Sequence, residues 1–295
     1  MSQQVRFTKA HGAGNDFVIM PDPEGTGVLD AARARALCDR RTGIGADGIL
    51  RVAPTASIAG YADDAVVAPW FMDYRNADGS QGAMCGNGLR VFARYLVDSG
   101  LVPAGEFAIA TRAGVRTVRV PEQGDVTVDM GVPIFGAQTA RVKVAEEWHE
   151  SANVDMGNPH AVVILDDVAD AGPLHRAPEY EPLSVYPEGV TFDFVAALEP
   201  RRLRMRVYER GVGETYSCGT GACAAVITVA RRDQAPGNAR YVVETLGGPL
   251  DVALHPHGRM ELTGPALLVA DGTWRDPDWN PRPCTENSSG NSSAQ

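Results

Sequence analysis

Short runs of alternating or β-branched residues recur along the whole chain and predict that β-strands make up most of its regular structure. In the first half these runs lie at residues 5–8, 17–20, 70–74, 107–110, 115–120 and 126–129. A second series follows Gly131-Val132-Pro133, at residues 154–156, 161–165, 192–196, 203–208, 241–244, 250–254 and 260–262. Both halves are therefore expected to be built mainly of strands.

Helical patterns are fewer. They predict helices over residues 31–38, with Asp30 as N-cap, over residues 89–97, ending near Gly100, and over residues 222–231. Residues 222–230 of the last helix are apolar or small around its whole circumference, so this helix must be buried on every side. Among so many strands the natural enclosure is a strongly curved sheet, which predicts an α+β fold with a sheet closed around a central helix in each half.

A faint internal repeat relates the two halves. Cys85-Gly86-Asn87-Gly88 precedes one predicted helix, and Cys218-Gly219-Thr220-Gly221 precedes another, 133 residues later. Gly14-Asn15-Asp16-Phe17 likewise resembles Gly157-Asn158-Pro159-His160, 143 residues later. A duplicated domain is the simplest explanation of these matches.

Composition limits the classes of function. The 295 residues suffice for about two domains, and 44% of them are hydrophobic, as in a globular protein with a core. Lys and Arg number 27 against 37 Asp and Glu, a net charge of −10, which disfavours nucleic acid and membrane surfaces as partners. Five cysteines, a start unlike a signal peptide and no long apolar run predict a cytoplasmic protein with reduced thiols. The polar segment 283–295 is expected to be a disordered tail.

The two Cys-Gly-x-Gly segments carry the candidate chemistry. A helix N-terminus stabilises a thiolate, so we expect each cysteine to have a pKa below the usual value of about 8.5. The glycines after it let a carboxylate approach the free N–H groups. If the halves face each other, Cys85 and Cys218 flank one cleft. One group can then remove a proton from a carbon and the other can return a proton from the opposite side, which predicts racemisation or epimerisation without a cofactor.

At these residues the sequence resembles the diaminopimelate epimerase family of cofactor-independent, two-cysteine enzymes. The resemblance covers ordered blocks from residue 11 to the Gly264-Pro265 turn. They lie at residues 11–18, 43–48, 76–80, 84–90, 156–160, 209–215 and 217–222. It implies two pseudo-symmetric domains, each a β-barrel-like sheet wrapped around a central helix: residues 1–130 with a returning segment 265–282, and residues 131–264.

The resemblance also implies an activity. Cys85 and Cys218 would act as a thiolate/thiol pair that interconverts LL- and meso-2,6-diaminopimelate, a precursor of lysine and peptidoglycan. Family usage makes Cys85 the donor and Cys218 the acceptor in one direction, with the roles exchanged in reverse. The expected partner is this small-molecule substrate, the expected assembly is a homodimer, and no cofactor or metal is expected.

Further site residues follow from the same resemblance, each with a structural alternative such as helix capping, a salt bridge or a satisfied core histidine. Asn15 would hold the reactive end of the substrate. The reactive carboxylate and amine would be cradled by Gly86, Asn87, Gly219 and Thr220, the distal amino-acid head would be recognised by Asn76, Asn158, Glu209 and Arg210, and the cysteines would be tuned by His160 and Glu209. Thr191 stands where the family has an Asn at the distal head, so distal recognition is expected to be weaker or differently shaped.

Three alternatives remain open or are rejected on the sequence. Residues 43–48 satisfy the Gly-x-Gly-x-x-Gly pattern, but a helix precedes them and residues 49–52 look extended, which argues against a dinucleotide-binding oxidoreductase. An epimerase for another amino acid is possible, although Arg210, Asn76 and Asn158 favour a substrate with a second charged head. A redox protein that cycles a Cys85–Cys218 disulfide is the third alternative, and the carboxylate cradles argue against it. His255-Pro256-His257 has no Cys or acidic neighbour and is expected to be a turn.

Overall fold

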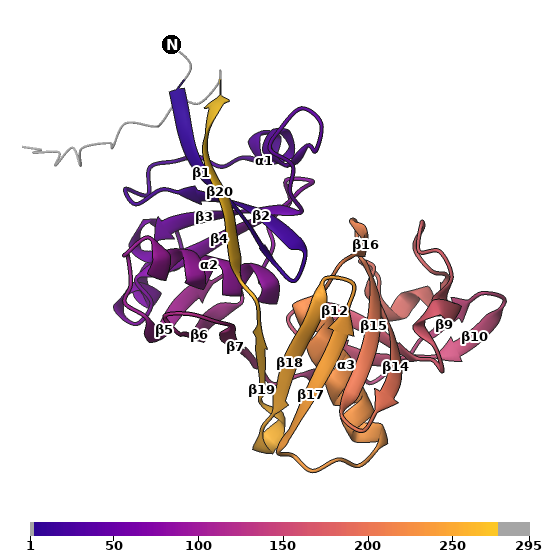
Figure 1. Ribbon diagram of the computed structural model, residues 1–295. Helices are drawn as coiled ribbons and strands as arrows, with labels where there is room; N and C mark the ends of the chain where they lie inside the picture. Colours follow the sequence, from indigo (N-terminus) through magenta and orange to yellow (C-terminus); the bar gives the residue numbers. More distant parts are fainter. Residues whose placement is uncertain (1–2, 277–295) are drawn as a thin grey trace, which may run out of the picture.

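The computed structural model describes residues 3–276 and shows two lobes, each with one long helix packed among strands (Figure 1). In the first lobe the elements are β1 (Gln3–Gly12), β2 (Asn15–Pro21), α1 (Ala31–Cys38), β3 (Gly48–Pro54), the 3-10 helices η1 (Thr55–Ser57) and η2 (Ala62–Val66), β4 (Trp70–Asn76), α2 (Gly86–Asp98), β5 (Gly105–Thr111), β6 (Gly114–Val120) and β7 (Val126–Gly131).

The second series begins after β7. Its elements are β8 (Ile134–Phe135), β9 (Arg141–Val144), β10 (Glu147–Glu150), β11 (Ala152–Asp155), β12 (Pro159–Ile164), η3 (Val168–Ala171), β13 (Tyr180–Glu181), η4 (Leu183–Val185), β14 (Thr191–Glu199), β15 (Arg202–Glu209), β16 (Gly213–Thr215), α3 (Gly219–Arg232), β17 (Ala239–Thr245), β18 (Gly248–Leu254), η5 (Pro256–Gly258), β19 (Met260–Gly264) and β20 (Leu267–Asp276).

Every strand run predicted from the sequence overlaps a strand of the structure, and all three predicted helices are present. The helix at 31–38 has the predicted bounds, and Asp30 caps it by accepting from the N–H of Arg33 at 2.9 Å. The other two helices begin three residues earlier than predicted, at Gly86 and Gly219. Glycine is a poor helix former, but here the preceding cysteine side chain satisfies the first turn.

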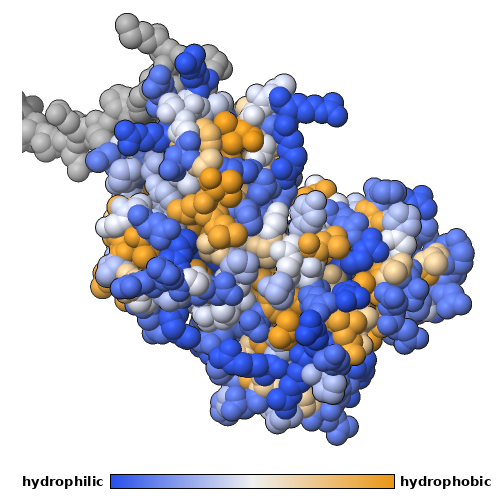
Figure 2. All heavy atoms as spheres, viewed as in Figure 1, coloured by the Kyte–Doolittle hydropathy of each residue, from blue (hydrophilic) through white to orange (hydrophobic). Residues whose placement is uncertain are grey.

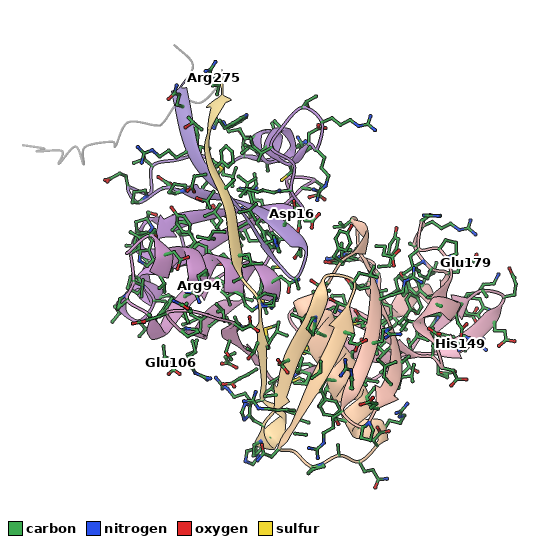
Figure 3. The ribbon with its side chains drawn as sticks, viewed as in Figure 1. Asp16, Arg94, Glu106, His149, Glu179 and Arg275 are labelled. Carbon is green, nitrogen blue, oxygen red and sulfur yellow. The ribbon has the colours of Figure 1, made fainter. Side chains whose placement is uncertain are left out.

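Backbone hydrogen bonds join 17 strands within residues 3–276 into one sheet. β19 links the lobes because it pairs antiparallel with β18 on one side and with β7 on the other. The chain then returns along the first lobe, where β20 pairs antiparallel with β1 (Figure 1). A separate small sheet of β10, β9 and β13 lies at the far end of the second lobe, near His149 and Glu179 in Figure 3.

The long helices α2 and α3 carry the buried core of their lobes. α2 packs against β1, β2, β6 and β7, and α3 packs against β11, β12, β14, β15 and β18. Every residue of α3 from Gly219 to Ile227 is buried, which confirms that this helix of small residues is enclosed on all sides. The fold is thus a mixed α+β fold, consisting mostly of strands with three α-helices in residues 3–276.

The face shown in Figure 2 is mainly hydrophilic, and hydrophobic atoms gather along the path of β20, where Leu267 and Val269 are more than half exposed. Between residues 3 and 276, no helix is long and apolar enough to cross a membrane. The predicted disordered tail 283–295, and with it Cys284, lies outside the described residues, as does the part of the returning segment beyond residue 276.

Candidate active site

The two Cys-Gly-x-Gly segments have the same local geometry. Cys85 is the N-cap of α2, and its Sγ accepts from the N–H of Gly88 at 3.4 Å. Cys218 is the N-cap of α3, and its Sγ accepts from the N–H of Gly221, also at 3.4 Å. Each thiol therefore sits at the positive end of a helix, as the sequence predicts.

The two helix N-termini touch. A Cβ atom added to Gly219 would lie 3.2 Å from the Cα of Gly86 and 3.3 Å from the backbone N of Asn87. The first turns of α2 and α3 can approach this closely only because glycine follows each cysteine. The side chain of Leu262, from β19, packs against both glycines. The chain thus brings two segments that are 133 residues apart into backbone contact.

A cavity of about 240 Å³ opens where the helices meet, and both cysteines line it. The predicted site residues that line this cavity are Asn15, Asn76, Cys85, Gly86, Asn87, Asn158, Thr191, Glu209, Arg210, Cys218, Gly219 and Thr220. The structure therefore brings together, around one small volume, nearly the whole set that the sequence selected. His160 is the exception, because it is fully buried and does not line the cavity.

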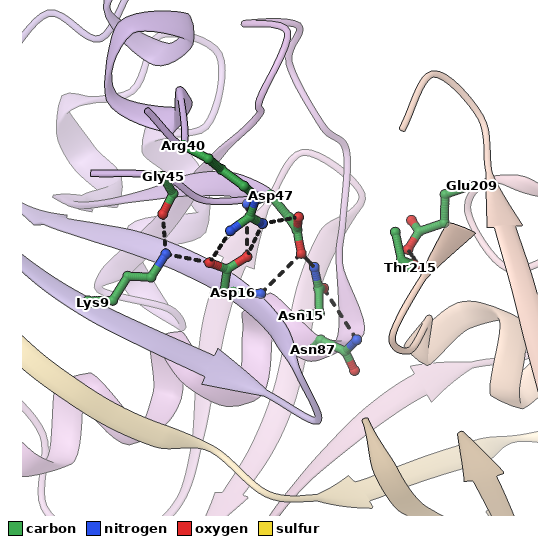
Figure 4. Close-up of polar contacts among 9 residues, drawn as sticks. All are labelled: Lys9, Asn15, Asp16, Arg40, Gly45, Asp47, Asn87, Glu209 and Thr215. Carbon is green, nitrogen blue, oxygen red and sulfur yellow. Dashed lines mark hydrogen bonds and ion pairs between the residues drawn. The ribbon is translucent and has the colours of Figure 1, made fainter. Parts of the chain in front are cut away.

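The orientation of Asn15 is set by Asp47 (Figure 4). The Nδ2 group of Asn15 donates to Asp47 Oδ2 at 2.8 Å, so its Oδ1 is the atom that faces the cysteine and accepts from Cys85 Sγ at 3.8 Å. Arg40 in turn donates to Asp47 Oδ1 at 2.8 Å. A chain of polar contacts from the surface cation to the thiol thus fixes which end of the Asn15 amide meets Cys85.

Asn87 is held in the same way by a buried arginine. Arg90 donates to Asn87 Oδ1 at 2.9 Å, and the Nδ2 group of Asn87 donates to the hydroxyl of Ser217 at 2.9 Å and to the carbonyl of Ser217 at 3.0 Å. Ser217 directly precedes Cys218, so this contact ties α2 to the start of α3. Burial lowers the pKa of Arg90 to about 10.

The pKa values of the thiols differ from the expectation based on the helix ends. Burial raises the pKa of Cys85 to about 12, and it raises the pKa of Cys218 well above its ordinary value. The N–H groups of Gly88 and Gly221 lower each pKa, but the loss of water around a buried thiolate outweighs them. The prediction of two low-pKa thiols is therefore wrong for the protein without substrate, because burial was not visible in the sequence.

Glu209 faces both thiols. Burial raises its pKa to about 7, and its Oε1 accepts from the hydroxyl of Thr215 at 2.6 Å. When ionised, its carboxylate raises the pKa of Cys85 and of Cys218. Within residues 3–276, Glu209 forms no salt bridge with Arg210, whose guanidinium is exposed and donates to the carbonyl of Glu188 at 2.8 Å. The structural alternative for this pair, a salt bridge between Glu209 and Arg210, is therefore wrong.

His160 contacts Asp193 beneath α3. Its Nδ1 lies 2.7 Å from Asp193 Oδ2, and both side chains are fully buried. The alternative of a satisfied core histidine holds for only one ring nitrogen, because Nε2 has no hydrogen-bond partner in residues 3–276.

Two predicted residues have local partners of their own. Asn76 accepts from the hydroxyl of Tyr74 at 2.7 Å and donates to the hydroxyl of Ser80 at 2.8 Å, so its amide is positioned at the edge of the cavity. Thr191 begins β14, is almost fully buried, and pairs across the parallel ladder with His160.

A larger and more open cavity, of about 1020 Å³, adjoins the small one, and both are lined by Asn76, Arg210 and Val212. Its other side carries the cluster of Lys9, Asp16, Arg40 and Asp47 in Figure 4. Figure 3 shows Asp16 on the side of the first lobe that faces the second. The two cavities therefore share part of their walls.

The Gly-x-Gly-x-x-Gly match and the two histidines at residues 255 and 257 are not nucleotide or metal motifs in the structure. Residues 43–47 form the loop between α1 and β3, and β3 begins at Gly48, so the match lacks the strand before it and the helix after it, as predicted. His255 precedes the single turn η5, and His257 lies in it. In the part of the chain from residue 3 to residue 276, no three His, Cys, Asp or Glu side chains are grouped so that they could hold a metal ion.

Sequence reasoning missed four residues that shape the site: Asp47, Arg90, Asp193 and Ser217. Three of them lie within or beside the family blocks, at residues 43–48, 84–90 and 217–222, so their position was a usable signal. Asp193 lies in none of these blocks, and only its contact with His160 reveals it.

The fold is shared with known epimerases. The crystal structure of a hydroxyproline epimerase from Agrobacterium vitis, with bound trans-4-hydroxy-L-proline, superposes with a TM-score of 0.70 at 16% sequence identity, covering 94% of this chain and 95% of that one. The chain, with its pair of cysteine-capped helices, thus has the same fold as this epimerase.

Closer relatives give the family. The sequence profile of diaminopimelate epimerase matches residues 7–136 and 152–269. The diaminopimelate epimerase of Streptomyces coelicolor is 49% identical over 284 residues, which are 95% of this chain and 98% of that protein. That of Thermobifida fusca is 47% identical over 282 residues, 92% of this chain and 98% of that protein. The chain belongs to the diaminopimelate epimerase family, and it is an isomerase.

Proposed function

We propose that this chain interconverts LL- and meso-2,6-diaminopimelate by cofactor-free proton transfer between Cys85 and Cys218. The observation that carries this assignment of roles is the contact between two helix N-termini, each capped by one of these cysteines, at one cavity. The family and its curated relatives support the substrate.

The reaction needs one thiolate and one thiol. The thiolate takes the α-proton, so an S–H bond forms as the C–H bond breaks, and the electron pair left on carbon delocalises into the carboxylate. The opposite thiol then gives its proton to the other face of the carbon, and its own S–H bond breaks. The free N–H groups of the first turns of α2 and α3 would stabilise the negative charge that develops on the carboxylate.

The distal head of the substrate would meet Asn76, Asn158, Glu209 and Arg210, all of which line the cavity. Arg210 is exposed beside the open cavity and can form a paired contact with a carboxylate, while Glu209 can accept from an ammonium. Thr191 offers one hydroxyl where the family has an amide, so we propose that distal recognition has fewer hydrogen bonds here.

Proton exchange in deuterated water tests this function. The parent protein is compared with Cys85→Ser and Cys218→Ser, using LL-diaminopimelate and measuring both epimerisation and deuterium incorporation at the α-carbon. Loss of epimerisation in both variants is expected, since inversion needs both groups. Near-normal turnover in either variant would rule out the two-base assignment.

The same exchange assay, run on other substrates, distinguishes this function from an epimerase for another amino acid and from a redox protein. A panel of single-headed substrates, proline and hydroxyproline among them, should be turned over much more slowly than diaminopimelate, because they cannot contact Arg210 or Asn158. Faster turnover of a single-headed substrate would identify an epimerase for another amino acid. Thiol oxidation coupled to no proton exchange would identify a redox protein.

Three further expectations belong to this proposal. Each lobe would form a barrel-like sheet around its helix, with the domain boundary between residues 130 and 131 and with residues 265–282 returning to the first domain. The enclosure of α3 and the pairing of β20 with β1 support this arrangement. The protein would be a cytoplasmic homodimer, which a mass measurement by light scattering after gel filtration tests.

A further inference from the structure

Tyr74 lines the small cavity, but the two-cysteine chemistry gives it no role. It lies on β4, outside every block that resembles the family, and it shares the cavity wall with Cys85 and Asn76. Tyr74 and Asn76 are two positions apart on one strand, so their side chains point to the same face of the sheet. The hydroxyl of Tyr74 donates to Asn76 Oδ1 at 2.7 Å. Tyr74 therefore joins the wall beside Cys85 to a residue proposed for the distal head.

The ring of Tyr74 is held by close neighbours. A Cβ atom on Gly82 would lie 2.2 Å from Tyr74 Cδ1, and a Cβ atom on Gly48 would lie 2.7 Å from Cε2, at the opposite edge of the ring. Phe17 meets the ring edge to face, with 6.2 Å between the ring centroids. The N–H of Gly82 also donates to the carbonyl of Tyr74 at 3.1 Å. A ring packed this closely cannot turn aside, so the position of its hydroxyl is fixed.

This hydroxyl orients the amide of Asn76. Oδ1 accepts from Tyr74, and Nδ2 donates to Ser80 Oγ at 2.8 Å. A turn holds the backbone of Asn76, because its N–H donates to the carbonyl of Ser80 at 3.0 Å and its carbonyl accepts from the N–H of Gly79 at 2.9 Å. Nδ2 has two N–H groups, so one remains after Ser80 is satisfied. Asn76 therefore offers the cavity a hydrogen-bond donor.

Ser80 alone does not select this orientation, because an alkyl hydroxyl can donate to Oδ1 as well as accept from Nδ2. Tyr74 selects it as long as its hydroxyl keeps its proton and donates. Burial raises the pKa of Tyr74 well above its ordinary value, and the nearby acidic groups of Cys85 and Glu209 raise it further. The phenol thus stays neutral, and its proton is the one that Oδ1 accepts.

We propose that Tyr74 is a positioning residue that directs the free N–H of Asn76 toward a second carboxylate on the substrate, and that it thereby contributes to the choice of substrate. This inference rests on the proposed function. A carboxylate only accepts hydrogen bonds, so a reversed amide would place Oδ1 against it and repel it. Arg210 lines the same cavity and supplies the positive charge. Asn76 adds a neutral donor whose direction Tyr74 fixes.

Tyr74→Phe keeps the ring in place and removes only the hydroxyl. With LL-diaminopimelate, KM is expected to rise about tenfold while kcat stays within about twofold, because the contact belongs to the distal head and is the same in the ground state and the transition state. An unchanged KM overturns the proposal. A fall in kcat at unchanged KM also overturns it, since Tyr74 would then act at the reacting carbon.

A double variant tests whether Tyr74 acts through Asn76. KM should agree within about twofold between Asn76→Ala and Tyr74→Phe/Asn76→Ala. A further rise in the double variant overturns the proposal, because Tyr74 would then contact the substrate itself. Tyr180→Phe is the matched control, because the hydroxyl of Tyr180 donates to the carbonyl of Tyr186 at 2.9 Å and lies in β13 of the separate small sheet. It should keep both KM and kcat.

Nuclear magnetic resonance of the free protein supplies a readout without substrate, so failure of this inference is distinguishable from failure of the proposed function. The side-chain amide signal of Asn76 is identified by its absence in Asn76→Ala. In the parent, its two protons should show stronger Overhauser contacts to the β-protons of Ser80 than to the ε-protons of Tyr74. The reverse order overturns the proposal. In Tyr74→Phe this preference should be lost, and a preference that persists shows that Ser80 suffices and overturns it too.

Discussion

Gly219→Ala probes the contact on which the site is built. Its new Cβ would lie 3.2 Å from Gly86 Cα, 3.3 Å from the backbone N of Asn87 and 2.8 Å from Leu262 Cδ2. The methyl of Leu262 can rotate, but two of the three neighbours are backbone. The first turns of α2 and α3 must therefore separate by a few tenths of an ångström.

The expected change in folding stability of Gly219→Ala is the balance of two opposing effects. Alanine is a better helix former than glycine by up to about 1 kcal/mol. Overpacking a close contact costs about 1–3 kcal/mol, and it dominates here because neither backbone can move aside freely. A loss of about 1 kcal/mol lowers the melting temperature by about 2 °C in a chain of this size. Displacement of the two thiols should cost more in activity, about tenfold or beyond in kcat, since proton transfer depends steeply on geometry.

Thermal unfolding and α-proton exchange, measured together, test this prediction. Gly237→Ala is the matched control, because a Cβ there would meet only ordinary contacts at 3.8 and 4.0 Å and its φ is not in the left-handed region. It should keep both melting temperature and rate. If Gly219→Ala melts no lower than the parent and turns over at the parent rate, the helix ends do not need this close approach.

Three further outcomes are expected. Asp47→Ala should free the Asn15 amide to flip and lower kcat by about tenfold, with no loss of folding; an unchanged rate would show that another group orients Asn15. Glu209 has a pKa of about 7 in the folded protein, raised by burial from 4.5, so the parent loses stability as pH rises through this window. Glu209→Gln should not lose stability in this way. Urea unfolding below and above this pH window should show that the free energy of unfolding of the parent falls relative to that of the variant by about 2–3 kcal/mol. Oxidation to a Cys85–Cys218 disulfide should abolish activity and dithiothreitol should restore it; full activity of the oxidised form, verified by mass spectrometry, would contradict this.

Much of the fold could be predicted because it follows local patterns. Alternation of apolar residues marked the strands of both lobes, and the apolar or small residues 222–230 predicted a helix buried on every side. The short strands β8, β9, β10, β13 and β16 were missed, since two to four residues carry too little pattern to identify a strand.

The helix starts show where a local rule fails for a physical reason. Propensity alone places the beginnings of α2 and α3 after their glycines, at residues 89 and 222. The observed starts at Gly86 and Gly219 depend on a cysteine side chain that caps the first turn and on a second helix that leaves no room for a Cβ.

The sequence by itself determined the strand-rich architecture and the two cysteine-capped helices, because each follows from local spacing or from a repeated motif. Its resemblance to the family supplied the other predicted residues that line the cavity. Only the tertiary structure decided the pKa of the two thiols and the residues that pack beneath each of them. Burial, which raises their pKa, and the packing of Phe17 and Leu50 beneath α2 but of His160 and Asp193 beneath α3 arise from contacts between distant strands. Such contacts depend on how the strands pack, and no local pattern in the chain encodes them.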